Sequence, residues 1–333
     1  MAQTTNTVLM VRPVISEELN KTDNPIKEQS KKISPVIENE IIKEFDNFVQ
    51  ELRRWQVIVM EIQDTPQPWT PDSIFPNDWL STHTKEERER NGKAINCKAL
   101  KTMDAILDLP DAEIYIVLYP MSVPDRRIEK YKIPTKILKE HFGEKAFFVD
   151  LSEFEKENKF LEGPGSVVFD RENKIIYACR SEITNEEVVE RLAILLNYRY
   201  FMFDSVQPDN KFYKHTDNIL SIGSKFAIVC FDAIKGEEEK KNLKKLLTET
   251  GKEIIELEPE QVKHFAGNII EINTHKDGIC QPVYVLSQSA KNTLKDEQLK
   301  KLSDYAIIIS PDLSRIENID GGSAKCMLAE IFG

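Results

Sequence analysis

Ser166-Val-Val-Phe-Asp170 and Ile175-Ile-Tyr-Ala-Cys179 are two short apolar runs separated by a polar turn. This composition is typical of a pair of buried β-strands. Apolar residues at helical spacing follow between positions 188 and 196, and a third apolar run follows in Arg199-Tyr-Phe-Met-Phe203. The order of these segments predicts a unit of two strands, an amphipathic helix and a third strand.

The same unit occurs twice more in the second half of the chain. The second copy is expected to contain strands at 217–222, 226–230 and 253–257, with a helix at 237–248. The third copy is expected to contain strands at 269–272, 283–286 and 305–309, with a helix at 293–302. A period of roughly fifty residues indicates a repeat architecture.

The first half fits the same scheme less closely. It predicts strands at 8–11, 57–62, 113–118 and 146–149, and helices at 37–52 and 128–141. An irregular segment with four prolines, residues 63–77, lies between its two parts, and loops of that length are often functional. We expect an α/β fold of five ββαβ units around one axis, in a single domain spanning residues 1–333. Whether the 63–77 loop is a mobile lid is left open.

Composition limits the classes of partner. The 333 residues include 45 Lys and Arg against 56 Asp and Glu, a net charge of -11. Such a protein lacks the positive field that draws nucleic acids, so a small cationic ligand is a better match. The apolar stretch at 8–11 is too short for a signal sequence or a membrane span, which predicts a cytoplasmic protein that does not bind membranes. The sequence leaves open whether it forms a homo-oligomer.

The cysteines favour a free thiol over a structural role. There are five, at positions 97, 179, 230, 280 and 326, and no two are spaced as Cys-x-x-Cys. An odd number at wide spacing indicates neither a disulfide framework nor a zinc site. We therefore expect no metal.

Polar residues occur at corresponding ends of the repeat units. Glu162 precedes the strand of the first unit, His215 and Asp217 precede the next, and Cys326 lies near the C-terminal end. If the units surround an axis, these ends converge. A thiol, an imidazole and carboxylates are the groups needed for covalent catalysis by an activated thiol.

The surroundings of Cys326 suggest a reactive cysteine. Gly321-Gly322 predicts a turn and Ser323 is a candidate N-cap, which would place Cys326 in the first turn of a short helix. Backbone N–H groups there stabilise a thiolate. The alternative is a small apolar core residue, because free cysteines are among the most buried residues.

The chain resembles the arginine deiminase and amidinotransferase superfamily, which has the pentein or α/β-propeller fold, and within it the bacterial branch that includes citrulline-hydrolysing enzymes. The resemblance spans nearly the whole chain. It is carried by Val11-Arg12-Pro13, Phe75-Pro-Asn-Asp-Trp-Leu-Ser-Thr-His83, Leu118-Tyr-Pro-Met121 with Arg126-Arg127, Leu161-Glu-Gly-Pro-Gly-Ser166 with Asp170-Arg171, Tyr213-Lys-His-Thr-Asp217, and Gly321-Gly-Ser-Ala-Lys-Cys-Met-Leu-Ala-Glu-Ile331.

The resemblance implies a cofactor-free hydrolase of the guanidino or ureido carbon of an arginine- or citrulline-like amino acid. Cys326 would be the nucleophile, forming a covalent intermediate, and His215 the acid and base, with Glu162 as the third catalytic residue. Asp78, Glu162 and Asp217 would hold the planar head group. The resemblance also makes Arg12, Arg126 and Arg127 candidates for binding a substrate carboxylate.

Other interpretations stay open at this point. The same thiol could pass the amidino group to an amine, and the same fold also serves in a non-catalytic ribosome anti-association factor. Asp78, Glu162 and Asp217 could each cap or solvate a turn, and the three arginines could be surface residues. The chain also departs from the superfamily pattern at Pro164 and Lys214, which puts the identity of the substrate in doubt.

Overall fold

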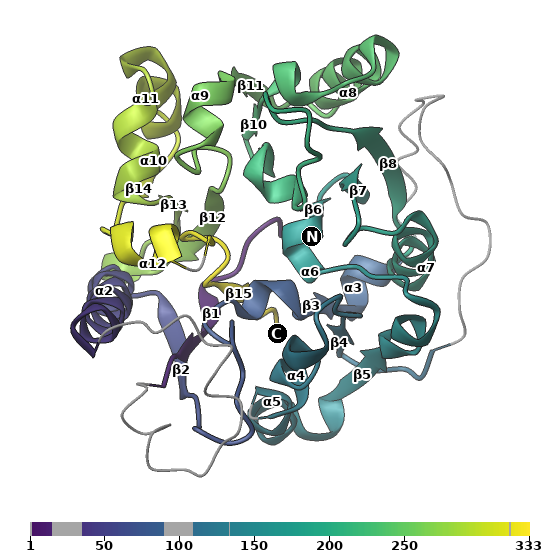
Figure 1. Ribbon diagram of the computed structural model, residues 1–333, viewed down its shortest axis with the longest axis vertical. Coiled ribbons are helices and arrows are strands. Elements are labelled where there is room, and N and C mark those ends of the chain that lie inside the picture. Colours follow the sequence, from purple (N-terminus) through teal and green to yellow (C-terminus); the bar gives the residue numbers. More distant parts are fainter. Residues whose placement is uncertain (1, 15–34, 90–108, 133, 320) are drawn as a thin grey trace.

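The computed structural model describes residues 2–14, 35–89, 109–132, 134–319 and 321–333. Within these ranges the strands form five sheets of three strands each (Figure 1). In each sheet the middle strand is antiparallel to one neighbour and parallel to the other. The five sheets fit the predicted repeat units, and the fold is mixed α/β.

One sheet contains β1 (Thr7–Arg12), β2 (Ile58–Gln63) and β15 (Ala329–Glu330). A second sheet contains β3 (Leu80–Thr84), β4 (Ile114–Leu118) and β5 (Ala146–Asp150). The remaining sheets contain β6 (Val167–Asp170), β7 (Ile175–Arg180) and β8 (Arg199–Asp204); β9 (Leu220–Ile222), β10 (Phe226–Val229) and β11 (Glu253–Glu256); and β12 (Ile270–Thr274), β13 (Gln281–Val285) and β14 (Ile307–Ile309).

The two ends of the chain share one sheet. β15 pairs with β1, with Val8 opposite Glu330 and Leu9 opposite Ala329. The pairing continues beyond the strand, because the backbone N–H of Ile331 donates to the carbonyl of Thr7 at 2.9 Å. The sheet therefore fixes the segment that carries Cys326, which ends just before β15.

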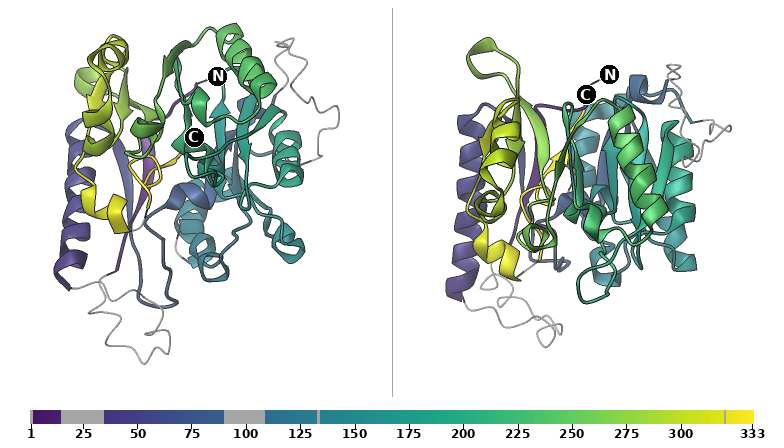
Figure 2. Two further views of the ribbon diagram at one scale, coloured as in Figure 1. Left: turned by 45° about the horizontal axis from the view of Figure 1, so that its top comes forward. Right: turned by 90° about the horizontal axis from the view of Figure 1, so that it is seen from above.

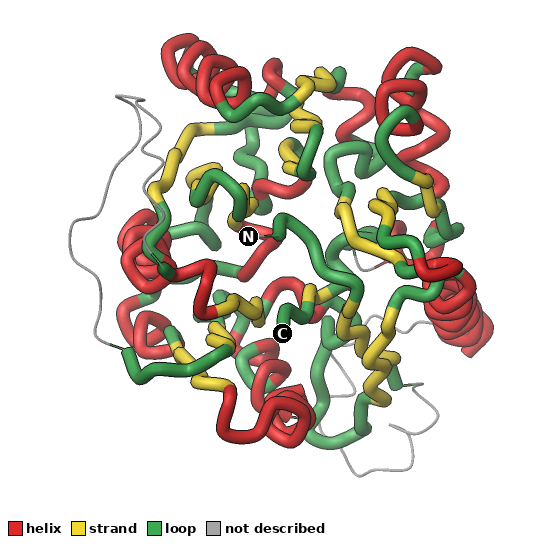
Figure 3. Tube along the Cα trace, turned by 180° about the vertical axis from the view of Figure 1, so that it is seen from behind, coloured by secondary structure: helices red, strands yellow, loops and turns green. Residues whose placement is uncertain are grey.

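The helices lie mainly around the outside of the strands (Figure 3). They are α2 (Pro35–Arg54), α3 (Lys85–Arg88), α4 (Glu129–Lys132), α5 (Pro134–Phe142), α6 (Gly163–Ser166), α7 (Glu186–Leu196), α8 (Glu237–Glu249), α9 (Pro259–Val262), α10 (Gln288–Thr293), α11 (Asp296–Ser303) and α12 (Ser314–Ile319). No helix in the described part of the chain is long and apolar enough to cross a membrane.

Two predicted helices correspond to helices of the structure with adjusted bounds. The helix expected at 128–141 is matched by α4 and α5, which lie on either side of residue 133, a position outside the described ranges. The helix expected at 293–302 is instead α10 and α11, with extended backbone at Leu294 and Lys295 between them.

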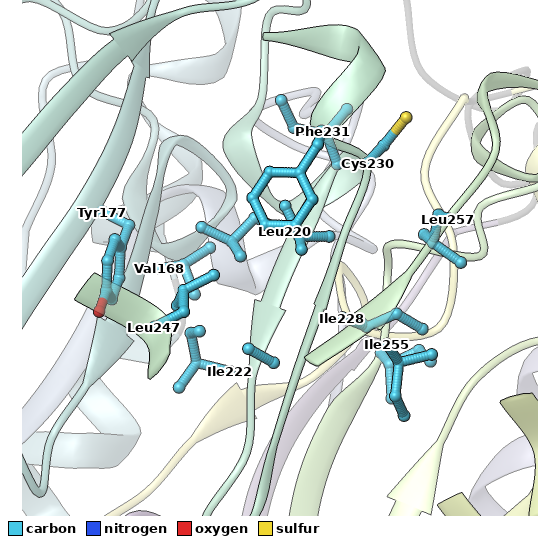
Figure 4. Close-up of a cluster of buried hydrophobic side chains, with 14 of the residues drawn as sticks. Val168, Tyr177, Leu220, Ile222, Ile228, Cys230, Phe231, Leu247, Ile255 and Leu257 are labelled. Carbon is cyan, nitrogen blue, oxygen red and sulfur yellow. The ribbon is translucent and has the colours of Figure 1, made fainter. Parts of the chain in front are cut away.

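The largest apolar cluster fills the space between the sheets of β6–β8, β9–β11 and β12–β14 (Figure 4). It contains Val168 and Tyr177 from one sheet, Leu220 and Ile228 from the next, and Leu247 from α8. Burial of this apolar surface is the main favourable contribution to folding. The polar segments at the ends of these strands are therefore held by a rigid apolar core.

α12 connects the outermost long helix to the Cys326 segment. It lies beside α2 in Figure 2, and the carboxylate of Glu44 in α2 accepts hydrogen bonds from the backbone N–H groups of Arg315 and Ile316 at 2.9 and 3.1 Å. A carboxylate at a helix N-terminus satisfies donors that have no partner within the helix. From the same helix, Glu317 accepts a hydrogen bond from Ser323 at 2.6 Å, which attaches the loop before Cys326.

Candidate active site

The candidate residues lie on turns that precede the first strands of their sheets. Glu162 lies five positions before the start of β6, and His215 lies five positions before the start of β9. Asp217 and Cys326 each lie three positions before their first strands, β9 and β15. Equivalent positions in different repeats therefore provide the imidazole, the thiol and two carboxylates.

Short 3₁₀ turns present two of the carboxylates. Asp78 ends the 3₁₀ turn Pro76–Asp78 before β3, and Asp217 is the middle residue of the turn Thr216–Asn218 before β9. Asp217 was expected to begin a strand, and that prediction is wrong because the turn replaces the first three residues of the predicted run. The turn buries the Asp217 side chain completely.

His215 and Glu162 form an ion pair. Nε2 of His215 lies 3.3 Å from Oε2 of Glu162, and the other carboxylate oxygen accepts hydrogen bonds from the backbone N–H and hydroxyl of Ser122 at 3.2 and 2.5 Å. Burial alone would lower the pKa of His215, but the charge of Asp78 and the bond to Glu162 raise it to about 9. Burial would raise the pKa of Glu162, but the paired imidazole and Arg126 lower it to about 2. The pair is therefore charged at neutral pH.

Arg126 holds several carboxylates at once. Its Nη2 lies 2.9 Å from Oδ2 of Asp78, and its Nη1 lies 3.6 Å from Oε2 of Glu162. Its Nε lies 3.2 Å from both Asp72 and Glu129. Burial would lower the pKa of this guanidinium, but the surrounding carboxylates raise it. The structure gives Arg126 a place in the site, with protein carboxylates as its partners; a contact with a substrate carboxylate stays a prediction.

Cys326 is buried and bonded through its sulfur. Nδ2 of Asn268 lies 3.4 Å from Sγ and also donates to Oδ2 of Asp217 at 3.1 Å. Burial raises the pKa of the Cys326 thiol well above its ordinary value, and the charges of Asp217 and Asp78 raise it further. These surroundings therefore favour the protonated thiol over the thiolate.

The predicted helical setting of Cys326 is wrong. Residues 324–327 form a hydrogen-bonded turn, in which the N–H of Met327 approaches the carbonyl of Ser323 at 3.4 Å. Ser323 does not cap a helix, because its hydroxyl donates to Glu317. The helix N-terminus expected to stabilise a thiolate is therefore absent from the described segment around Cys326.

Three buried polar atoms on the turns of the site have no hydrogen-bond partner among the described residues. They are Oδ1 of Asp78, Oδ1 of Asp217 and Nδ2 of Asn77. The second oxygen of each aspartate is held by a protein cation or amide, so one oxygen of each side chain is available. Buried polar atoms without partners are costly and rare, which makes these three atoms candidates for ligand contact.

Two glycines allow the turns to approach each other. A Cβ added to Gly163, which has φ +48°, would lie 2.3 Å from the carbonyl oxygen of Asn77. A Cβ added to Gly165 would lie 2.8 Å from Oδ1 of Asp78 and 3.4 Å from the ring of His215. The Gly-Pro-Gly sequence is thus required for close packing of Glu162, Asp78 and His215.

The remaining predicted residues lie apart from these contacts. Arg12 donates to Asp46 of α2 at 2.7 Å and to Gln63 at 3.0 Å. Arg127 donates to the carbonyl of Met121 at 3.1 Å. Their proposed contact with a substrate carboxylate stays a prediction. Lys214 is exposed and pairs with Glu182 at 2.7 Å, so its side chain faces solvent.

Sequence reasoning missed two residues as members of the site, Asn268 and Lys325. Asn268 links the thiol to Asp217, and Nζ of Lys325 lies 3.5 Å from Oδ2 of Asp217. A signal for Asn268 was present, because it lies two positions before β12, as Asp78 lies two positions before β3. For Lys325 the only signal in the sequence was its position next to Cys326.

A metal ion would find donors in this site only by displacing other groups. Asp78, Glu162 and His215 each offer a ligand atom within 4.8 Å of the others. Arg126 already pairs with both carboxylates, and the raised pKa of His215 keeps a proton on the imidazole. Metal ligation requires the neutral imidazole. The donor set is therefore better suited to a ligand that donates hydrogen bonds.

A model of the eukaryotic N,N dimethylarginine dimethylhydrolase family matches residues 13–90 and 105–333. The chain belongs to this family. The superfamily expected from the sequence is thereby confirmed, and the N,N dimethylarginine dimethylhydrolase family consists of enzymes that hydrolyse carbon–nitrogen bonds. No curated protein sequence matches the chain significantly.

Solved structures with the same fold cover nearly the whole chain. The N-terminal domain of ArgZ, an arginine dihydrolase from the ornithine–ammonia cycle in cyanobacteria, was solved bound to its substrate; it is 15% identical, has a TM-score of 0.64, and covers 97% of each chain. A dimethylarginine dimethylaminohydrolase variant solved as an adduct with S-methyl-L-thiocitrulline is 13% identical, with a TM-score of 0.59, covering 98% of this chain and 99% of the other. At these identities the likeness extends to the fold.

Proposed function

We propose that this member of the N,N dimethylarginine dimethylhydrolase family hydrolyses the guanidino carbon of free arginine or an N-methylated arginine, with Cys326 as the nucleophile. The observation that carries the proposal is the pair of unpaired acceptor oxygens, Oδ1 of Asp78 and Oδ1 of Asp217. A guanidinium group is planar and presents N–H donors along its edges. It would satisfy both oxygens while its carbon faces the thiol.

The charges of the site support a cationic substrate. The charges of Asp78 and Asp217 oppose loss of the Cys326 proton. A bound guanidinium would offset both negative charges, so substrate binding itself would ease loss of the thiol proton. The resulting thiolate next to a cation is the reactive pair that the mechanism requires.

The proposed chemistry has two steps. On substrate binding, the Cys326 thiol loses its proton to solvent water. In the first step, the sulfur of the resulting thiolate forms a bond to the guanidino carbon, and the C–N bond to the departing nitrogen breaks as that nitrogen takes a proton from His215. In the second, the now neutral His215 accepts one proton from water, whose oxygen bonds to the same carbon; the C–S bond breaks and the other proton of that water returns to the sulfur. The products are a free amine or ammonia and an ureido amino acid. Glu162 keeps His215 oriented and protonated for the first step.

A solved structure with the same fold supports a covalent path. A variant of the ArgZ N-terminal domain was solved covalently bound to a reaction intermediate.

For this chain we further propose a closed five-bladed α/β-propeller in one domain spanning residues 1–333. We also propose action in the cytoplasm. Pairing of β15 with β1, which joins the two ends of the chain, supports the closed arrangement.

The test is turnover of arginine, its N-methylated forms, citrulline and agmatine, measured as released ammonia or amine together with the carbon product. We expect Cys326→Ala to abolish turnover, with loss of at least a thousandfold, while circular dichroism stays unchanged. Cys280→Ala is the matched control, because Cys280 is exposed, and it should retain full activity. Full activity of Cys326→Ala would refute the mechanism. Product formed only when an amine acceptor is added would refute hydrolysis in favour of transfer.

A further inference from the structure

Lys325 is a buried cation that no step above uses. Its side chain is 9% exposed, and its Nζ lies 3.5 Å from Oδ2 of Asp217 and 3.4 Å from the carbonyl oxygen of Pro164. Its backbone N–H donates to Oδ1 of Asn268 at 3.0 Å. The residue next to the nucleophile is thus attached to three other turns of the site.

The ammonium compensates one particular carboxylate. A buried charge is tolerated only when a partner of opposite sign is close, and Asp217 is that partner. Asp78 pairs with Arg126 and Glu162 pairs with His215 and Arg126. Lys325 is the cation that forms an ion pair with Asp217, and the charge of His215 also acts on this carboxylate.

The pairing of Lys325 with Asp217 also affects ionisation of the Cys326 thiol. Asp217 and Asp78 are the two charged groups that oppose ionisation of Cys326, and Asn268 bridges Asp217 to the sulfur. Asp217 is also among the groups that keep His215 protonated. Lys325 also lines a cavity of about 30 Å³ together with Glu271 and Glu330, and its charge acts on Glu330.

We propose that Lys325 is a positioning residue which, by pairing with Asp217, eases loss of the Cys326 proton and leaves Oδ1 of Asp217 free for the substrate. The inference rests on the proposed function for its biological meaning, because it concerns the same thiol. It predicts opposite effects from the two partners. Removing the lysine charge exposes the thiol to the full charge of Asp217, whereas removing the Asp217 charge relieves the thiol.

The experiment measures the rate at which iodoacetamide alkylates Cys326 as a function of pH, read by mass spectrometry of the Cys326 peptide. The exposed Cys280 in the same sample provides an internal reference. Lys325→Met, which keeps the length of the buried stem, should move the alkylation profile of Cys326 upward by about one pH unit, with alkylation about tenfold slower at pH 8. Asp217→Asn should move it downward, and Lys325→Arg should stay near the wild type.

A matched control is Lys214→Met, which removes the same charge from an exposed lysine beside His215 and should not move the profile. In turnover, Lys325→Met should lower kcat while KM for a guanidinium substrate stays equal or falls, because Asp217 then attracts the cation more strongly. A purely structural role would raise KM and leave the alkylation profile unchanged.

Three outcomes would overturn the inference: an unshifted Cys326 profile in Lys325→Met, equal shifts in Lys325→Arg and Lys325→Met, or shifts of the same sign in Lys325→Met and Asp217→Asn. If Lys325→Met does not fold, Lys325→Gln takes its place. Absence of turnover in the wild-type protein would refute the proposed function, and the alkylation comparison would still decide the role of Lys325.

Discussion

The pair of His215 and Glu162 sets the protonation of the site. Burial opposes the charge on the imidazole, but Asp78, Glu162 and Asp217 outweigh it and raise the pKa of His215 to about 9. An imidazole with an ordinary pKa near 6.5 would be mostly neutral at pH 7.5 and could not donate its proton to a leaving amine. The carboxylates thus keep the imidazole of His215 protonated at neutral pH, as the proposed proton transfer to a leaving amine requires.

Glu162→Gln should therefore move the alkaline limit of activity. The substitution keeps the shape of the side chain but removes the charge that stabilises the imidazolium, so the pKa of His215 should fall. We expect kcat to decline above pH 9 in the wild type and to begin declining about one to two pH units lower in the variant. The measurement is kcat against pH between 6 and 10.

Glu182→Gln is the control for this comparison, since Glu182 pairs with exposed Lys214 next to His215. It should leave the alkaline limit where the wild type has it. An unchanged limit in Glu162→Gln would mean that another group supplies the proton.

At the scale of the elements, close packing of turns brings the chemistry together. Gly163 starts α6 and lies against the backbone of Asn77 and Asp78. The same arrangement recurs in another pair of repeats, where a Cβ on Gly267 would lie 2.1 Å from the carbonyl oxygen of Asn218. In both places the turn before one first strand packs on the turn before another.

Gly163→Ala should destabilise the protein and reduce activity together. Gly163 has φ +48°, and an added Cβ would collide with the backbone at Asn77, which cannot move as a flexible side chain could. We expect a loss of about 2 to 4 kcal/mol in the free energy of unfolding, which combines backbone strain with overpacking. Urea denaturation measures it.

Gly251→Ala separates backbone strain from overpacking. Gly251 also has positive φ, +74°, but nothing lies within 4 Å of its added Cβ. This substitution should lower the free energy of unfolding only by the backbone strain, about 1 kcal/mol, and leave kcat unchanged. Equal losses in the two variants would show that the contact between the turns adds nothing.

At the scale of the whole molecule, long-range pairing assembles the site from the two ends of the chain. β15 contains only two residues, Ala329 and Glu330, yet its pairing with β1 fixes the position of the preceding Cys326 turn. Loop 63–77 is held to the same site, because Asp72 lies 3.2 Å from Arg126 and its N–H donates to Glu129 at 2.9 Å. Segments distant in sequence thus share the charged groups around Arg126.

The repeat of the fold could be predicted from sequence because apolar runs record strands locally. β6–β8 and β9–β11 appear close to their predicted positions, while β3 and β15 were missed as strands. β15 is too short to show a period, and it exists only because β1 is beside it.

The site was only partly predictable for a related reason. Cys326, His215 and Glu162 could be nominated from repeat position and family resemblance. The pairing of Lys325 with Asp217 and the bridge through Asn268 join residues far apart in the chain, and local sequence does not specify such partners. The expected helix around Cys326 failed because Ser323 bonds to Glu317 instead of capping.

The most direct test of the central claim is to identify the atom that reacts with a substrate analogue. The protein is incubated with S-methyl-L-thiocitrulline, quenched with acid, digested and analysed by mass spectrometry. The account predicts one covalent adduct, on the peptide that contains Cys326, lost in Cys326→Ser and suppressed by excess arginine. Modification of exposed Cys280 alone, or no adduct on Cys326 in a protein that turns over arginine, would contradict it.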